Sequence, residues 1–379
     1  PMGKGELSTV ISGYRKQCLE LGVEFHMGQE VTEELIRTEA PDAVVLATGS
    51  VPFIPDIPGK EQANILTHIH VAFGKLTMEG DIVFDYHPFV KQMEQVRSWN
   101  PDIKIILSVV PQEPDAFTVV SASKELRENV AKTCARLVSQ DGFDGVDFDW
   151  EYPCVPSNGM NCTPDDRHNY TLLCEAAKRG MESVGGGSVS IAAGADLYYI
   201  DSIEPERMAE VLDYVCLMTY DLKCGFHALS GHHTALYSST GDIFKNSCDQ
   251  ALRLFENAGF PKEKLLMGAA FYSRKWDDVP DRYHGFLQLA KTGGGYGPNY
   301  DKLEEEYINK NGYVRYWDDE AKAPFLFNGS TFISYDDAES LTHKCEYVKR
   351  EGIGGIFYWC HSGDPKSVLL RTIGDAIKG

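Results

Sequence analysis

Short apolar runs rich in β-branched residues alternate along this chain with longer stretches whose charged residues recur at helical spacing. Continuous apolar runs of this kind are typical of parallel strands that are buried on both faces. They predict strands at Ala43–Ala47, Thr67–Phe73, Ile103–Val109, Gly145–Asp149, Ser188–Ala193, Tyr214–Thr219, Leu265–Ala270 and Gly355–Tyr358. The intervening segments predict helices at Phe89–Trp99, Ala122–Ser139, Asp165–Ser183, Glu204–Leu212, Asp242–Ala258 and Ala338–Glu351. This alternation predicts an α/β fold, the (β/α)8 TIM barrel.

Two parts of the chain depart from the alternation. The predicted seventh and eighth strands are separated by about 80 residues, far more than a usual connection of about 4–6 residues. Residues 276–334 of this stretch hold a Gly-rich turn and several Tyr and Trp residues, which predicts a small α+β subdomain inserted between these strands. Residues 1–66 contain further strand-like segments outside this alternation. Because a barrel of seven strands would leave an open edge, we expect Ala43–Ala47 to supply strand 1.

The charge and hydropathy of the chain restrict its partners. The formal net charge is −20 over 379 residues, and a surface this acidic repels phosphate backbones, so we expect no nucleic acid partner. Neutral sugars are compatible with it. No apolar run reaches the length of about 18 residues that a membrane span needs, so we expect no membrane insertion. A monomer is expected, and the first residues show no secretory signal, so the localisation is left unassigned.

The ten cysteines do not indicate a metal centre. Most stand alone in apolar or helical segments, without the repeated C-x-x-C spacing of zinc sites, and are interpreted as reduced, buried thiols. Cys154 and Cys162 flank a short polar loop, and a disulfide between them stays an alternative. We expect neither a metal nor a cofactor.

The strongest chemical signal lies in residues 141–153, which read D-G-F-D-G-V-D-F-D-W-E-Y-P. Side chains alternate between the two faces of a strand, so Asp147, Asp149 and Glu151 point to one side. Buried acids this close cannot all ionise, so they share protons and at least one pKa rises. Glu151 comes last, at the carboxyl end of the strand, where barrel enzymes carry their catalytic groups. The pattern predicts a proton donor; a metal-binding loop would have small or polar residues between its acids.

These acids form a D-x-x-D-x-D-x-E motif, with Asp144 as its first member, that resembles the signature of glycoside hydrolase family 18. Further blocks resemble segments of that family in the same order: Thr67–Phe73, Met218–Asp221, Gly268–Arg274 and Gly354–Trp359. The resemblance covers residues 67–379, and the insertion is similar to that of the chitinase branch. It implies a hydrolase of β-1,4-linked N-acetylglucosamine.

The resemblance also implies a retaining mechanism in which the substrate supplies the nucleophile. Glu151 would protonate the glycosidic oxygen while the 2-acetamido oxygen of the sugar attacks the anomeric carbon, giving an oxazolinium ion. Asp149 would orient the acetamido group, Asp147 would share a proton with it, and Tyr220 would hold the acetamido oxygen. Sugar contacts are expected from Trp359, Met218, Asp221, Tyr272, Arg274, Phe73 and Tyr152. Without the resemblance, core packing would be an alternative role for individual members of this set.

Two segments differ from the family pattern. Where the third strand of the family carries a Ser-x-Gly-Gly turn, this chain has Ser108–Gln112, which puts sugar contacts on that side in question. Residues 1–66 resemble a fragment of the nucleotide-binding region of enoate reductases and related flavin oxidoreductases, for example over Pro41–Ser50. This fragment lacks the G-x-G-x-x-G phosphate turn, so we expect it to be non-functional and the chain to be a hybrid.

The leading hypothesis is therefore a chitinase-like enzyme acting on chitin or chitooligosaccharides. An endo-β-N-acetylglucosaminidase acting on glycans or peptidoglycan stays open as an alternative. A non-catalytic, lectin-like sugar-binding protein also stays open, although the retained Glu151 argues against it.

Overall fold

The computed structural model describes residues 66–85, 89–156 and 159–378, together with the single residues 16, 21 and 38. The chain divides into two compact units, Pro1–Phe53 and Ile54–Gly379. Almost all of the first unit lies outside the described residues, and so does the predicted strand Ala43–Ala47. The fold given below is that of the second unit.

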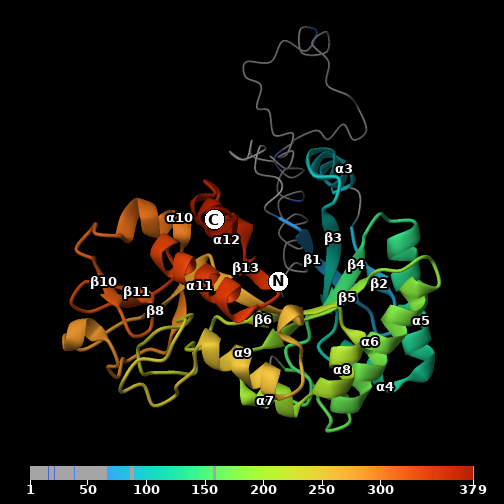
Figure 1. The fold of residues 1–379 in the computed structure, drawn as a ribbon, viewed down its shortest axis with the longest axis horizontal. Helices are drawn as coiled ribbons and strands as arrows, with labels where there is room; N and C mark the ends of the chain where they lie inside the picture. Colours follow the sequence, from blue (N-terminus) through green and yellow to red (C-terminus); the bar gives the residue numbers. More distant parts are fainter. Residues whose placement is uncertain are drawn as a thin grey trace. The chain divides into compact units, whose positions relative to one another are not determined.

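The second unit is organised around a sheet of eight strands in the order β13-β7-β6-β5-β4-β3-β1-β2 (Figure 1). The strands are β1 (His68–Leu76), β2 (Ile82–Val83), β3 (Lys104–Pro111), β4 (Gly145–Phe148), β5 (Ser188–Gly194), β6 (Tyr214–Met218), β7 (Leu265–Ala270) and β13 (Gly355–Trp359). All pairs are parallel except β1 with β2. Parallel strands that neighbour one another in chain order form a TIM-barrel-like arrangement, and this confirms the predicted fold class.

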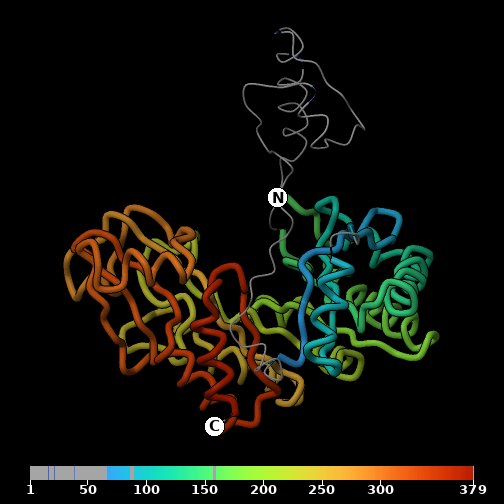
Figure 2. Tube along the Cα trace, turned by 90° about the horizontal axis from the view of Figure 1, so that it is seen from above, coloured from blue at the N-terminus to red at the C-terminus, as the bar shows by residue number. Residues whose placement is uncertain are grey.

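Helices lie between the parallel strands along the chain, and a last helix follows β13. They are α3 (Val90–Trp99), α4 (Ala116–Ala122), α5 (Lys124–Ser139), α6 (Asp166–Glu182), α7 (Leu197–Asp201), α8 (Pro205–Val211), α9 (Cys248–Asn257), α11 (Ala338–Glu351) and α12 (Val368–Lys378). Helices α5 and α6 pack side by side against β4 and β5, and Figures 1 and 2 both place them on the opposite side of this unit from the segment between β7 and β13. No described helix is long and apolar enough to cross a membrane.

Serine caps explain where two helices differ from the prediction. The hydroxyl of Ser123 accepts a hydrogen bond from the Leu126 N–H, so α5 begins after Ser123 and α4 is a separate helix. The hydroxyl of Ser247 accepts from the Gln250 N–H, so α9 begins at Cys248 and not at Asp242. In both places the periodic pattern continued through a residue that the structure uses as a helix boundary.

The segment between β7 and β13 forms a second, antiparallel sheet in the order β10-β11-β12-β8-β9. Its strands are β8 (Tyr272–Trp276), β9 (Gly295–Asn299), β10 (Val314–Asp318), β11 (Ala323–Phe327) and β12 (Phe332–Ser334). Trp276, Phe325 and Phe332 form the centre of a separate apolar cluster in this sheet. The predicted insertion between strands seven and eight is thus confirmed. Strand β8 starts almost directly after β7, which brings its first residues to the end of the barrel strands.

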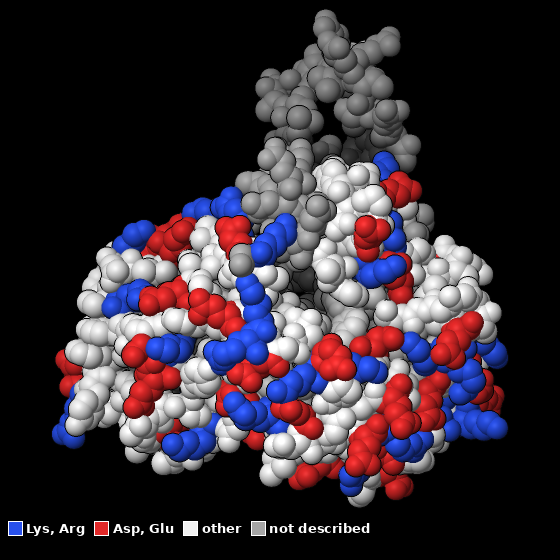
Figure 3. Space-filling model, in the orientation of Figure 1, with Lys and Arg blue, Asp and Glu red and all other residues white. Residues whose placement is uncertain are grey.

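Charged side chains of both signs lie on the face of the second unit that Figure 3 draws. On the face drawn in Figure 3, Lys and Arg lie interspersed with Asp and Glu, so the acidic excess of the chain is not gathered there into one field. Ion pairs of the second unit include Arg179–Glu128 and Lys178–Asp213.

Candidate active site

The acidic row continues the line of β4 beyond its last residue. The Asp149 N–H donates to the Val109 carbonyl of β3 at 2.9 Å, so the chain stays extended after Phe148. Trp150 points away from the acids, is 1% exposed and stacks on Phe117 of α4 with ring centroids 5.1 Å apart. The alternation expected for a strand therefore holds through this segment, with aromatic residues on one side and carboxyl groups on the other.

Asp147 is the deepest acid of the row, at 2% exposed. The Ser108 hydroxyl donates to its Oδ2 at 2.8 Å and the Ser190 hydroxyl to its Oδ1 at 2.6 Å. His70 Nδ1 lies 3.6 Å from Oδ2. Burial opposes ionisation of Asp147, but the charge of His70 and the hydrogen bonds from His70, Ser190 and Ser108 outweigh it, and its pKa is lowered. Asp147 is thus the ionised member of the row.

Asp149 and Glu151 are the two acids that hold a proton. Burial, the charge of Glu151 and the charge of Asp147 raise the pKa of Asp149 well above its usual value. The pKa of Glu151 is raised by burial and by the charge of Asp221, which outweigh its hydrogen bonds with Tyr152 and Asp149. A hydrogen bond joins the two carboxyl groups, so a proton held there is available to either of them.

Asp221 has the opposite electrostatic environment. Arg274 of β8 donates two hydrogen bonds to its carboxylate, from Nε to Oδ1 at 2.7 Å and from Nη2 to Oδ2. The Tyr272 hydroxyl donates to Oδ1 at 2.8 Å, and His233 Nδ1 lies 3.6 Å from the same oxygen. Burial opposes the charge, but the hydrogen bonds and charges of His233 and Arg274 outweigh it and lower the pKa of Asp221. Arg274 also lies 3.7 Å above the Tyr296 ring. Asp221 is therefore a fixed anion.

Tyr220 follows β6 and lies against two aromatic rings. Its ring centroid is 5.9 Å from that of Tyr272 and 6.1 Å from that of Phe357. A Cβ added at Gly268 would come 2.9 Å from the Tyr220 ring, so only glycine leaves room for it. Burial and the charge of Asp149 raise the pKa of Tyr220 well above its usual value, so its hydroxyl stays protonated and can donate. Met218, the last residue of β6, is half-buried.

Three further predicted residues are aromatic and accessible. Trp359 ends β13, is 38% exposed, and stacks on Phe73 with ring centroids 5.5 Å apart. A tryptophan exposed to this degree is not a buried core residue, so its ring is available for contact. Tyr152, directly after Glu151, is half-buried and meets the Tyr198 ring edge-on at 5.2 Å.

Sequence reasoning did not single out the partners of Asp147. Ser108 stands opposite Asp147 in the β3–β4 register, and Ser190 stands opposite it in the β4–β5 register. The sequence signal for these partners was a serine in the middle of each of the two apolar strands β3 and β5. His70 lies in the matched block Thr67–Phe73, where its contact with a residue on β4 could not be foreseen. His233 and Tyr296, which support Asp221 and Arg274, come from loops and from the insertion.

Two other groupings of the described residues are less suited to ligands. His70, Asp147 and Cys216 come close enough to hold a metal ion. Both oxygens of Asp147 already accept serine hydroxyls, and burial raises the pKa of the Cys216 thiol well above its usual value, so this donor set does not favour a cation. Cys154 and Cys162 are free thiols.

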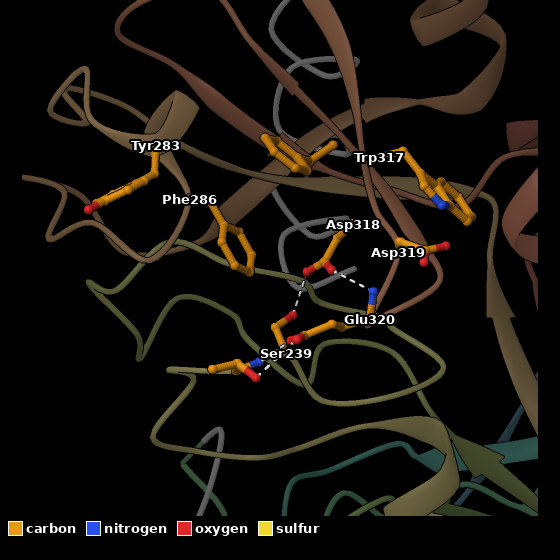
Figure 4. Close-up of a pocket in the computed structure, with 9 residues that line it drawn as sticks. Ser239, Tyr283, Phe286, Trp317, Asp318, Asp319 and Glu320 are labelled. Carbon is orange, nitrogen blue, oxygen red and sulfur yellow. Dashed lines mark hydrogen bonds between the residues drawn. The ribbon is translucent and has the colours of Figure 1, made fainter.

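A hollow of about 300 Å³ lies partly on the insertion and is lined by aromatic and acidic residues (Figure 4). Its acids are committed within the protein. Asp318 accepts from the Ser239 hydroxyl and from the Glu320 N–H, and Glu320 accepts from the Thr240 N–H and hydroxyl. These contacts hold two loops together. Two acids with a raised pKa that could donate a proton lie in the acidic row.

Comparison with known proteins agrees with this geometry. The model of the family described as Glycosyl hydrolases family 18 matches residues 48–364. Chitinase A1 of Niallia circulans is 35% identical over 306 residues, covering 75% of this chain and 44% of that protein. A probable endochitinase of Caenorhabditis elegans is 28% identical over 347 residues, covering 82% and 53%. The chain thus spans about half the length of these curated relatives.

A solved structure gives a match over nearly its whole length. The glycoside hydrolase family 18 N-acetylglucosaminidase from Paenibacillus barengoltzii has 43% sequence identity and a TM-score of 0.81. The match covers 84% of this chain and 95% of that one.

Proposed function

This chain belongs to glycoside hydrolase family 18, and on that premise we propose that it hydrolyses β-1,4-linked N-acetylglucosamine with retention of configuration. It is a chitinase-like enzyme. One observation carries the proposed mechanism. Asp149 and Glu151 share a hydrogen bond and both have a raised pKa, beside an ionised Asp147. A carboxyl group whose pKa is raised above its usual value is suited to act as a general acid.

In the first step Glu151 transfers its proton to the glycosidic oxygen, and the bond from that oxygen to the anomeric carbon breaks. The carbonyl oxygen of the 2-acetamido group forms the new bond to the anomeric carbon, which gives an oxazolinium ion. Asp149 accepts a hydrogen bond from the acetamido N–H and faces the positive charge that develops on the oxazolinium ring. The negative charge of Asp147 behind it strengthens this stabilisation.

In the second step the ionised Glu151 takes a proton from a water molecule. The water oxygen attacks the anomeric carbon and the oxazolinium ring opens, so the acetamido group is restored. Two displacements at the same carbon return the original anomeric configuration. Glu151 ends the cycle protonated, as it began.

The sugar contacts come from the predicted aromatic and polar residues. The exposed ring of Trp359, braced by Phe73, provides an apolar surface for the pyranose ring. The protonated Tyr220 hydroxyl donates to the acetamido oxygen and aligns it for attack. Tyr272 and Arg274 are held by Asp221 at the edge of the insertion, where a neighbouring sugar would lie. Tyr152 and Met218 complete the subsite.

A second candidate function has support from the solved-structure match. A relative that is 43% identical is named an N-acetylglucosaminidase, which favours removal of single N-acetylglucosamine units over internal cleavage of long chains. Product analysis separates the two, because an enzyme of the first type converts chitotetraose at early times to equal amounts of monosaccharide and chitotriose. An internal cleavage enzyme releases mainly disaccharide.

The proposal is tested with fluorogenic glycosides of chitobiose and chitotriose. We expect release of the fluorophore, a fresh product with the β configuration by proton NMR, and competitive inhibition by a thiazoline analogue of the oxazolinium ion. A fresh α product would exclude retention, and binding of the sugars without any hydrolysis would favour the lectin-like alternative.

A further inference from the structure

A chain of polar side chains in contact lies behind the acidic row, and none of its outer members has a part in the mechanism above. His70 of β1 has its Nε2 2.9 Å from the Tyr214 hydroxyl of β6 and its Nδ1 3.6 Å from Asp147 Oδ2 of β4. The chain therefore connects three strands, two of which are separated by several others in the sheet.

The Tyr214 hydroxyl and the Asp147 carboxylate at the two ends of this chain determine which nitrogen of His70 accepts a hydrogen bond and which one donates. Burial raises the pKa of Tyr214 well above its usual value, so its hydroxyl keeps its proton and can donate to Nε2. A histidine that accepts a hydrogen bond at Nε2 carries its proton on Nδ1, which is the nitrogen that faces Asp147. The serine hydroxyls on Asp147 can rotate, whereas this N–H has a fixed direction.

The other groups around His70 do not offer Asp147 a positive charge. Tyr214 and Cys216 face it from β6, Asp147 faces it from β4, and His68 is two residues away on the same strand. His68 meets the Tyr214 ring edge-on at 5.2 Å and bonds to Thr67, with no contact to Asp147 among the described interactions. His70 is thus the one nitrogen base among these groups that reaches the acidic row.

We propose that His70, oriented by Tyr214, is a positioning residue that holds Asp147 as a carboxylate and so leaves the shared proton with Asp149 and Glu151. The inference rests on the proposed function for its catalytic consequence. Without His70, Asp147 takes up a proton more readily on acidification. The charge that favours a protonated Asp149 is then lost, and the row reaches a state that no longer stabilises the oxazolinium ion.

The pH profile of kcat/KM on the chitobiose glycoside tests this role. His70→Leu removes the N–H, and we expect the acid limb to move to higher pH by about one unit, with roughly a tenfold loss of kcat/KM on that limb. The alkaline limb stays in place, because it reports loss of the Glu151 proton while Asp147 is ionised in both proteins. KM changes little. In His70→Asn the amide nitrogen can replace Nδ1, so much of the shift is reversed.

His68→Asn is the matched control, since it changes the same residue type beside the same tyrosine. Its acid limb stays at the wild-type position. A His70→Leu profile that is lowered uniformly, or that moves no further than the His68→Asn profile, overturns the proposal. Tyr214→Phe gives a smaller shift in the same direction and covers the case in which His70→Leu does not fold.

Nitrogen-15 NMR of the imidazole rings decides the inference independently of activity. We expect His70 to be protonated at Nδ1 near neutral pH, and this tautomer preference to weaken in Tyr214→Phe. A His70 ring protonated only at Nε2 overturns the proposal. An inactive wild-type enzyme would count against the proposed function, while the tautomer would still support or overturn the role of His70.

Discussion

Asp149 and Asp221 are two half-buried carboxyl groups of one site whose pKa values move in opposite directions. Both lose hydration on folding, which by itself raises the pKa of an acid. Asp149 is surrounded by Glu151 and Asp147, so its pKa rises further, whereas Asp221 accepts two hydrogen bonds from Arg274 and its pKa falls. Burial acts in the same direction on both groups, so the difference between them comes from the charges and hydrogen bonds of their neighbours.

The two environments are also coupled. The charge of Asp221 is one of the causes that raise the pKa of Glu151. A permanently ionised acid at the edge of the site therefore helps a neighbouring acid to stay protonated. The Arg274–Asp221 pair thus contributes to the proton chemistry as well as to the shape of the sugar site.

The largest expected effect comes from removing the proton donor. Glu151→Gln keeps the size of the side chain but cannot transfer a proton, so kcat falls by about 10³-fold, within the range of general acid–base catalysis. KM changes far less. Hydrolysis of the chitobiose glycoside measures both, with Glu210→Gln on the exposed face of α8 as the control. If Glu151→Gln and wild type had the same rate, Glu151 would not be the proton donor.

Removing Arg274, the cation beside Asp221, tests the comparison through the free energy of unfolding. Arg274→Met leaves Asp221 charged and half-buried without its main partner, and we expect a loss of about 2 kcal/mol in the free energy of unfolding at pH 7. The control is Arg253→Met, because Arg253 also donates to an aspartate, Asp249, but on an exposed helix surface. That pair contributes only about 0.5 kcal/mol. Urea unfolding that gave equal losses would contradict the distinction.

Loss of the stacking surface is expected to change binding alone. Trp359→Ala removes the exposed ring that lies on Phe73, and we expect KM to rise roughly tenfold, or about 1.4 kcal/mol, with kcat nearly unchanged. Trp317→Ala, which changes an aromatic residue of the hollow in Figure 4, is the control and leaves KM unchanged. A fall in kcat without a change in KM would show that Trp359 supports the catalytic acids and does not bind substrate.

The sequence was sufficient for those features that local periodicity or a contiguous motif encodes. The run from Asp147 to Glu151 showed the alternation of acids and aromatics directly, and the apolar runs predicted the parallel strands. It could not show that Ser190 and His70 converge on Asp147, because strand register and the meeting of distant strands depend on the whole sheet. The helix boundaries at Ser123 and Ser247 were missed for a local reason, since a capping serine does not interrupt the periodic pattern.

The smallest expected effect is also the most direct test of the opening comparison. The pKa of Asp149 is raised in the folded state, so its contribution to stability is present below its unfolded pKa of about 3.9 and is lost as the pH rises. Asp149→Asn cannot ionise, and we therefore expect it to be more stable than wild type by about 1 kcal/mol at pH 7 and equal to it near pH 3.

For Asp221 the sign reverses. Its pKa is lowered on folding, so its contribution is fully present at pH 7 and is lost only as the pH falls below its unfolded pKa of about 3.9. Asp221→Asn is therefore less stable than wild type at pH 7 and less stable by a smaller amount near pH 3. Urea unfolding of both variants at the two pH values measures the signs, and a destabilised Asp149→Asn at pH 7 would show that the proton is held elsewhere in the acidic row.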